Sequence, residues 1–266
     1  MPNIEWNRDT WGGAAQWHDR GDCWSKAWGG PERQWQGTIL PRIEPFIPTG
    51  SILEIGPGFG RWTRFLKDAC ERLVVVDLNQ RCIDACQERF SGESHIEYHT
   101  TDGKSLAMIP DESIDFVFSF DSLVHVERDV IDSYLAQLRQ KMKKDAVAFI
   151  HHSNLAHYQN YFRWVRGIPV IRAFMRPFGF ETRTHGRGGS VSGDDFAKSA
   201  SQSGFSCIGQ EWINWSSPLL IDCFSFFTKV GSSWDRGNEV VKNRFFMDEA
   251  RCVSKRFYFP SDRRAA

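Results

Sequence analysis

The stretch Ser-Ile-Leu-Glu-Ile-Gly-Pro-Gly-Phe-Gly-Arg-Trp, residues 51–62, decides how the chain folds. Its first residues are mostly apolar, which is typical of a buried parallel strand. Gly56, Gly58 and Gly60 follow at alternate positions, and large apolar side chains then recur at helical spacing. Glycine is needed where the backbone takes unusual dihedral angles or lets a ligand approach closely. We therefore predict a strand, a glycine-rich turn, and a helix whose free N–H groups face a polar ligand.

Acidic residues near this turn support a ligand-binding role. Glu54 lies just before the first glycine, where the carboxyl edge of a sheet is expected. A second apolar run, residues 73–76, ends in Asp77, and its distance of about 20 residues from the first glycine suits a carboxylate that binds ribose hydroxyls. A third predicted strand, residues 95–99, leads into Asp102.

These segments together resemble the class I S-adenosylmethionine-dependent methyltransferases, over roughly residues 35–230. The matching residues are Glu54-Ile55-Gly56-Pro57-Gly58-Phe59-Gly60, Val76-Asp77, Asp102-Gly103 and Asp115-Phe116-Val117-Phe118-Ser119-Phe120-Asp121. The resemblance implies an α/β fold, a Rossmann-like doubly wound sheet of seven strands, six parallel and one antiparallel. It also implies S-adenosyl-L-methionine as cofactor and S-adenosyl-L-homocysteine as product.

The resemblance further implies which residues hold the cofactor. The glycine turn would hold its methionine part, Asp77 the ribose hydroxyls and Asp102 the adenine amino group. The family often carries Glu in place of Asp77, which is a small departure. The complete set of expected cofactor-binding residues is Glu54, Gly56, Gly58, Gly60, Arg61, Asp77, Leu78, Asp102, Gly103 and Phe120.

A dinucleotide-binding dehydrogenase is the alternative for a turn of this kind. Its turn has the spacing glycine-x-glycine-x-x-glycine, whereas Gly60 comes one residue early for that pattern. We therefore favour methyl transfer over hydride transfer.

The composition favours one α/β domain with appendages. The 266 residues carry 33 basic and 33 acidic side chains, so no bulk charge indicates a nucleic-acid partner. The seven cysteines are scattered without a Cys-x-x-Cys pair, which fits reduced thiols in the cytosol rather than disulfides or a zinc site. The N-terminus has no apolar signal core, and no apolar run reaches the ~18 residues of a membrane span. We expect a soluble, cytoplasmic protein.

The chain divides into three expected parts. Residues 1–48 form an N-terminal Trp-rich cap and helix, residues 49–233 the methyltransferase domain, and residues 234–266 a C-terminal helix and a basic aromatic tail. In the favoured interpretation the tryptophans of the cap cover the edge of the sheet. In the alternative they form an aromatic wall for a sugar or for the cofactor.

An insert over residues 155–190 interrupts the pattern with aromatic and arginine side chains. Methyltransferases of the class that this chain resembles commonly carry an acceptor-binding lid at this point. Within the insert, residues 161–178 alternate arginine with bulky apolar residues. This segment could instead lie on an anionic membrane surface and bring the enzyme to a lipid-linked glycan.

Hydrophobic spacing predicts the other elements. Helices are expected over residues 61–70, 79–90, 127–142 and 192–201, followed by a strand pair at 205–212 and 221–230 and a last helix that carries Val240, Val241, Phe245 and Phe246.

Methyl transfer to a hydroxyl requires an aligned acceptor and removal of a proton, and histidine suits the second task near neutral pH. Ligands of open parallel sheets bind beyond the carboxyl ends of the strands, where we expect His125, His151 and His152. Adjacent residues at a strand end point to opposite sides, so at most one of His151 and His152 faces the acceptor directly. Asp121 is a further candidate, to orient a histidine, to accept a proton or to join histidines around a divalent metal.

The acceptor is expected to be a sugar hydroxyl. Residues 121–127 and 151–154 resemble bacterial sugar O-methyltransferases, which implies saccharide modification such as polysaccharide biosynthesis. The alternatives are a natural-product O- or N-methyltransferase and a protein that binds the cofactor without turnover. A metal is not favoured, because hard cations prefer oxygen ligands and Asp121 is the one obvious carboxylate here.

Overall fold

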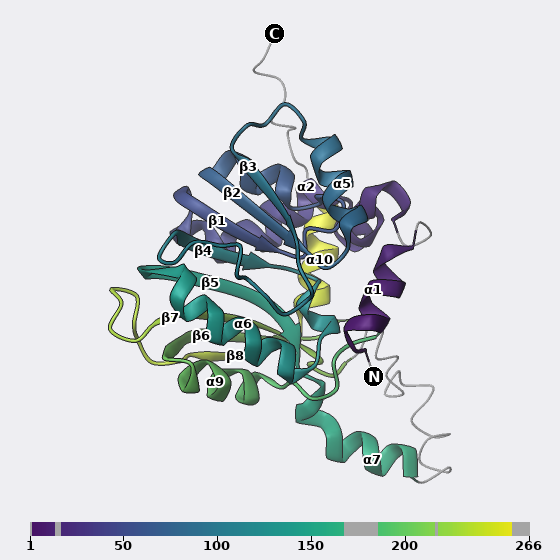
Figure 1. Ribbon diagram of the computed structural model, residues 1–266. Coiled ribbons are helices and arrows are strands. Elements are labelled where there is room, and N and C mark those ends of the chain that lie inside the picture. The colour runs from purple at the N-terminus through teal and green to yellow at the C-terminus, as the bar shows by residue number, and fades with distance from the viewer. Residues whose placement is uncertain (1, 14–16, 168–185, 216–217, 257–266) are drawn as a thin grey trace.

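The computed structural model describes residues 2–13, 17–167, 186–215 and 218–256, which form one mixed sheet with helices on both faces (Figure 1). The eight strands follow the order β3-β2-β1-β4-β5-β7-β6-β8 across the sheet. Their bounds are β1 Thr49–Ile55, β2 Cys70–Asp77, β3 Ile96–Thr100, β4 Ile114–Ser119, β5 Met142–Ser153, β6 Phe205–Ile213, β7 Asp222–Lys229 and β8 Val240–Asn243.

Strand directions confirm the expected Rossmann-like, doubly wound sheet. Strands β1 to β5 pair in parallel, and β7 is antiparallel to both of its neighbours, β5 and β6. The sheet has eight strands rather than the expected seven, because β8 adds in parallel to β6 at the edge.

This extra strand corrects the expected C-terminal helix. Val240 and Val241 lie opposite Gln210 and Glu211 of β6, and helix α10, Phe246–Lys255, begins only after them. β-Branched side chains favour strands, and β6 offers an open edge to pair with.

The helical segments vary in length and regularity. They are α1 Ile4–Gly12, α2 Pro31–Gln34, α3 Leu40–Ile43, α4 Thr63–Leu66, α5 Gln80–Arg89, α6 Arg128–Lys141, α7 Gln159–Gly167, α9 Gly193–Gln202 and α10, with 3₁₀ segments His18–Trp28, Glu44–Phe46, Lys67–Ala69, Leu123–His125 and Leu155–Tyr158 and a π-helical turn Trp35–Ile39. Helix α4 is shorter than the helix expected over residues 61–70, because β2 already begins at Cys70.

Two hydrophobic cores lie on the two faces of the sheet. Ile52 and Phe116 pack in one core with Phe246 of α10, whereas their neighbours Leu53 and Val117 pack in the other with residues of α6 and α9. Because successive strand residues point to opposite faces, continuous apolar strands are buried on both sides.

The insert is described only in part. Residues 168–185, and with them most of the segment 161–178 considered for membrane contact, lie outside the described residues. The described part includes α7, which extends away from the sheet (Figure 1), and the return of the chain at Gly186.

The N-cap of α9 offers a direct test of the fold. The Ser192 hydroxyl accepts the backbone N–H of Asp195 at 3.0 Å, so Ser192→Ala is expected to lower the free energy of unfolding by ~1 kcal/mol. Ser203→Ala at the other end of the helix, where no side-chain bond is made in the described part, serves as control. Urea denaturation measures both, and equal effects would contradict the assigned cap.

Candidate active site

A cavity of about 420 Å³ lies at the carboxyl ends of the central strands. Gly56 and Gly58 line it after β1, Asp77 lines it at the end of β2, and Phe120 lines it after β4. Small-molecule sites typically measure about 300–1,000 Å³. The cavity therefore has the place and the size of a ligand site in an open parallel sheet.

The glycine turn depends on left-handed backbone geometry. Gly56, Gly58 and Gly60 have φ angles of 74°, 57° and 81°, which favour glycine. A Cβ atom at Gly56 would lie 1.9 Å from Oγ of Ser122, and one at Gly58 would lie 2.3 Å from the ring of Trp17. The turn is thus closely packed against its neighbours as well as against the cavity.

Asp77 brings a buried carboxylate to the wall of the cavity. Its oxygens accept the backbone N–H groups of Asn79 at 2.8 Å and Gly58 at 3.2 Å. Burial raises the pKa of Asp77 to about 6, although these N–H groups act in the opposite direction. The carboxyl group of Asp77 is thus fixed in the cavity wall by the turns that follow β1 and β2.

Three residues expected to hold the cofactor do not line the cavity. Gly60 packs against Phe90, and the exposed Asp102 uses Oδ1 to accept backbone N–H groups within its own turn. Glu54 is buried and accepts the Thr63 hydroxyl at 2.7 Å, and burial raises its pKa to about 8. In this arrangement Glu54 supports the chain that follows the glycine turn. The other expected residues, Arg61, Leu78, Gly103 and Phe120, do line the cavity.

Tryptophans of the N-terminal segment form much of the cavity wall. Trp11, Trp17 and Trp24 line it, and their rings contact one another edge to face. Trp17 also stacks on Phe59 of the glycine turn, with ring centroids 4.5 Å apart. Trp28 instead packs in the core of the sheet. Trp28 is thus a core residue, whereas the other three form an aromatic wall of the cavity, and their use by a sugar or by the cofactor stays a prediction.

Asp121 and Arg61 form an ion pair in the cavity wall. Nη2 of Arg61 lies 2.8 Å from Oδ2 of Asp121, and the guanidinium packs over the rings of Trp24 and Trp62. Asp121 has a φ of 61°, a conformation that is uncommon for residues with a side chain. The loop after β4 is thus held in a strained shape that directs this carboxylate to Arg61.

His151 and His152 point to opposite sides of β5, as the strand geometry requires. His152 stacks on Phe196 of α9, and its nitrogens contact the Ser153 carbonyl and the Ser225 hydroxyl, each at 2.8 Å. Burial lowers its pKa to about 4. His152 was the first candidate for the base, but the structure places it in a closed core away from the cavity.

His151 acts as a supporting residue behind the cavity wall. Its Nδ1 accepts the backbone N–H of Asp121 at 3.1 Å, so Nε2 carries the proton and lies 3.4 Å from Oδ2 of Asp222. The ring is fully buried and contacts Phe120, which lines the cavity. His151 therefore holds the strained Asp121 peptide in place.

His125 is the histidine that lines the cavity. Its Nδ1 donates to the carbonyl of Gly186 at 2.9 Å, and its ring lies 4.8 Å from that of Trp11. Burial lowers the pKa of His125 to about 4. The ring is therefore neutral at physiological pH, with the Nε2 lone pair unused by any described residue.

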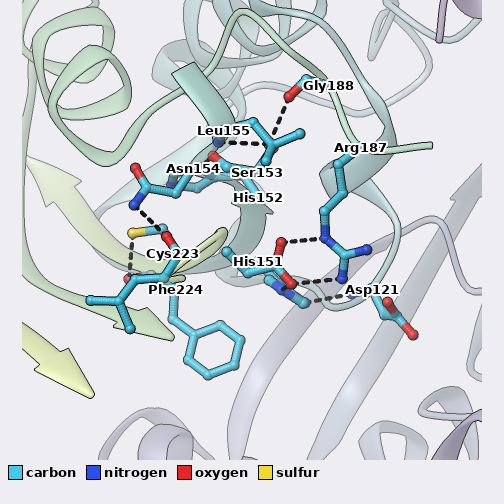
Figure 2. A network of polar contacts seen from close by, with 12 residues as sticks. Asp121, His151, His152, Ser153, Asn154, Leu155, Arg187, Gly188, Cys223 and Phe224 are labelled. Atoms are coloured by element: carbon cyan, nitrogen blue, oxygen red, sulfur yellow. Dashed lines mark hydrogen bonds and ion pairs between the residues drawn. The ribbon is translucent and has the colours of Figure 1, made fainter. Parts of the chain in front are cut away.

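Sequence reasoning missed Arg187, whose guanidinium lines the cavity from the far end of the insert. Arg187 binds Asp222 of β7 through Nε and Nη2, the latter at 2.7 Å (Figure 2). Burial opposes ionisation of Asp222, but Arg187 and His151 outweigh it and hold the pKa of Asp222 well below its usual range. No spacing in the sequence predicts this ion pair, because Arg187 and Asp222 lie on separate elements.

The described residues contain no group of three His, Cys, Asp or Glu side chains that could hold a metal ion. Within the same residues, no helix has the length and apolar character needed to cross a bilayer.

Comparison with known proteins finds a matching family and similar solved structures. Residues 52–145 match the profile of a family described as a methyltransferase domain. The fold is similar to the PH0226 protein of Pyrococcus horikoshii, with a TM-score of 0.54 and 18% identity over 74% of this chain and 91% of that one. It is also similar to an S-adenosylmethionine-dependent methyltransferase of Mesorhizobium loti, with a TM-score of 0.53 and 12% identity over 74% and 98%. The family match shows a methyltransferase domain within residues 52–145, about a third of the chain, and the two solved structures show that the fold is shared.

Curated relatives match short stretches of this chain. Ribosomal RNA small subunit methyltransferase A of Geobacter metallireducens is 36% identical over 62 residues, 22% of this chain and 22% of that protein. An rRNA adenine N-6-methyltransferase of Streptomyces fradiae is 34% identical over 68 residues, 26% of this chain and 21% of that protein. Nodulation protein S of Bradyrhizobium diazoefficiens is 33% identical over 86 residues, 32% and 40% of the two chains. The matches thus span between 21% and 40% of the length of each relative.

The cavity fits the cofactor of this domain class. Asp77 offers acceptor oxygens at one end, and the left-handed turn at Gly56 and Gly58 keeps side chains out of the space beside it. Arg61 lies beside the turn with its charge paired to Asp121.

Gly58→Val is expected to abolish binding of S-adenosylhomocysteine, because the new side chain would meet both an unfavourable φ and the Trp17 ring. Gly237→Val is the matched control, since a Cβ at Gly237 meets no atom within 4 Å. Calorimetry measures the affinity and circular dichroism checks the fold. A folded Gly58→Val protein with unchanged affinity would contradict the assigned turn.

Cofactor affinity should also depend on the ionisation of Asp77. Because its raised pKa is about 6, the carboxyl is ionised at pH 7.5 and mostly protonated at pH 5, so binding of S-adenosylhomocysteine should weaken as the pH falls through 6. Asp77→Asn should weaken binding at pH 7.5 by roughly 1.5–3 kcal/mol and remove this pH dependence. Wild-type affinity that stays constant between pH 7.5 and 5 would argue against the role of Asp77.

Proposed function

We propose that this protein transfers a methyl group from S-adenosylmethionine to a hydroxyl of a sugar or glycan, with His125 as the general base. The observation that carries the proposal is the state of His125. Hydrogen bonding of Nδ1 to Gly186 leaves Nε2 as the basic nitrogen of a neutral ring in the cavity wall. A hydroxyl group, unlike a neutral amine, needs such a base.

The donor supplies a methyl group on a sulfonium, so a carbon–sulfur bond breaks as the carbon–oxygen bond forms, and neutral S-adenosylhomocysteine leaves. The hydroxyl proton passes to Nε2 of His125. Burial and the charge of Arg187 disfavour the resulting imidazolium, whereas the bond to Gly186 and the carboxylates of Asp121 and Asp222 favour it. Asp121, paired with Arg61, is therefore an electrostatic support for the base rather than the base itself.

The aromatic wall supports a saccharide as acceptor. Trp11, Trp24, Trp62 and Trp215 line the same cavity as His125. Indole rings offer flat apolar faces with a polar edge, which suits sugar rings that carry apolar C–H faces. A lipid-linked glycan remains within this proposal, since α7, which belongs to the insert, exposes Arg163 and Trp164.

An amine of a natural product or of a nucleobase is the second candidate. It is favoured by the names of two relatives, which are rRNA methyltransferases, one of them specific for adenine N-6. Against nucleic acid, the formal charge is balanced and the cavity cations Arg61 and Arg187 are both paired with carboxylates.

An acceptor panel separates these candidates. The purified chain is incubated with S-adenosylmethionine and with monosaccharide glycosides, oligosaccharides, catechols, amines or rRNA, and release of S-adenosylhomocysteine is measured. We expect turnover with the saccharides. Turnover confined to amines, catechols or RNA would contradict the proposal.

His125→Asn tests the base. The asparagine amide can still donate to the Gly186 carbonyl but has no basic nitrogen, so turnover should fall about 10²–10⁴-fold with little change in affinity for S-adenosylhomocysteine. His157→Asn, at an exposed histidine outside the cavity lining, is the control. Equal turnover of the two variants would rule out His125 as the base.

A further inference from the structure

Among the residues that the structure describes, one N–H group of the Arg187 guanidinium has no hydrogen-bond partner. Nε and Nη2 both bind Asp222, whereas Nη1 binds no described residue and points away from these bonds in Figure 2. The side chain is almost fully buried and lines the cavity, as does His125. The two bonds to Asp222 fix the plane of the guanidinium, whose central carbon lies 5.8 Å from the centroid of the Trp215 ring.

Arg187 and the catalytic candidates lie close enough to influence one another electrostatically. The charge of Arg187 helps to lower the pKa of His125, although burial contributes more. Asp121 in turn favours the charged form of Arg187. His125 also bonds to the carbonyl of Gly186, the residue before Arg187, and His125, Arg187 and Asp121 all line the cavity, so the Nη1 group, the proposed base and this carboxylate lie near one another.

The charge of Arg187 is already matched inside the protein. Asp222 is fully buried and takes two hydrogen bonds from the guanidinium, and the second cavity cation, Arg61, is paired with Asp121. An anionic acceptor would add an unpaired negative charge to a buried site, which is costly. A neutral oxygen can accept the Nη1 hydrogen bond without this cost.

We infer that Arg187 determines acceptor specificity by donating Nη1–H to a neutral oxygen next to the hydroxyl that is methylated. The inference rests on the proposed function and narrows its substrate class to neutral sugars with a vicinal diol. The reacting hydroxyl faces His125, its neighbour accepts from Arg187, and the ring packs against the tryptophan faces. Uronic acids and sugar phosphates are excluded at this end of the cavity.

Matched acceptors test this assignment without altering the protein. The probes are methyl glycosides of glucose, galactose, mannose and rhamnose, their singly deoxygenated counterparts, and the corresponding uronates where these exist. For a glycoside that is methylated, removing the hydroxyl next to the methylated position should lower kcat/KM at least about tenfold, because a buried donor loses its partner. The uronate should be no better than its neutral parent.

Variants connect this preference to Arg187. Arg187→Lys should lower kcat/KM for the parent glycoside about tenfold and make parent and deoxy compound nearly equal, with unchanged affinity for S-adenosylhomocysteine. The double variant Arg187→Gln/Asp222→Asn keeps the buried pair neutral and serves if the lysine variant does not fold. Arg128→Lys, at a surface ion pair with Asp195, is the control and should retain the preference.

The outcomes distinguish failure of this inference from failure of the proposed function on which it rests. Equal rates with parent and deoxy glycosides, or preference for the uronate, would overturn the inference and leave sugar methylation standing. Loss of S-adenosylhomocysteine affinity in the Arg187 variants would show that Nη1 binds the cofactor rather than the acceptor. This result would also overturn the inference. Intact cofactor binding without methylation of any glycoside would overturn both.

Discussion

The site depends on a backbone constraint at the end of β1. Gly56, Gly58 and Gly60 all take positive φ angles, which turn the chain sharply between the strand and α4. The turn brings the backbone beside Asp77 of the neighbouring strand and leaves open space above both. Side chains at these three positions would collide with Ser122, Trp17 and Phe90, respectively.

Charge pairing is the second organising feature. The cavity holds two arginines, and each is matched by a carboxylate, Arg61 by Asp121 and Arg187 by Asp222. Truncating one partner of a buried pair leaves an uncompensated charge, which costs far more than the pair contributes. These two ion pairs therefore hold the strand ends and the insert together at the point where the acceptor is proposed to bind.

Much of the fold could be predicted from sequence, because apolar runs and glycine spacing report local backbone geometry. The glycine turn, Asp77 and the loop carrying Asp121 and His125 lie where these local patterns place them. The exposed Val240 and Val241 form an edge strand instead of a helix, since the open edge of β6 decided their conformation and only the folded sheet provides it.

The site itself could be predicted only where one element carries the signal. Strand alternation showed that His151 and His152 differ in direction, but which of them points toward the cavity depends on packing by other elements. Asp102 belongs to a segment that matches the family pattern, yet one of its carboxylate oxygens accepts backbone N–H groups of its own turn. No local sequence pattern marked Arg187 as a site residue, because its partner Asp222 lies on another element of the fold.

A crystal structure with S-adenosylhomocysteine bound is the most direct measurement of the central claim. The account predicts the ribose hydroxyls on Asp77, the homocysteine part along the glycine turn, and the sulfur facing the end of the cavity that holds His125. Binding of the ligand outside this cavity, or with its ribose away from Asp77, would contradict it.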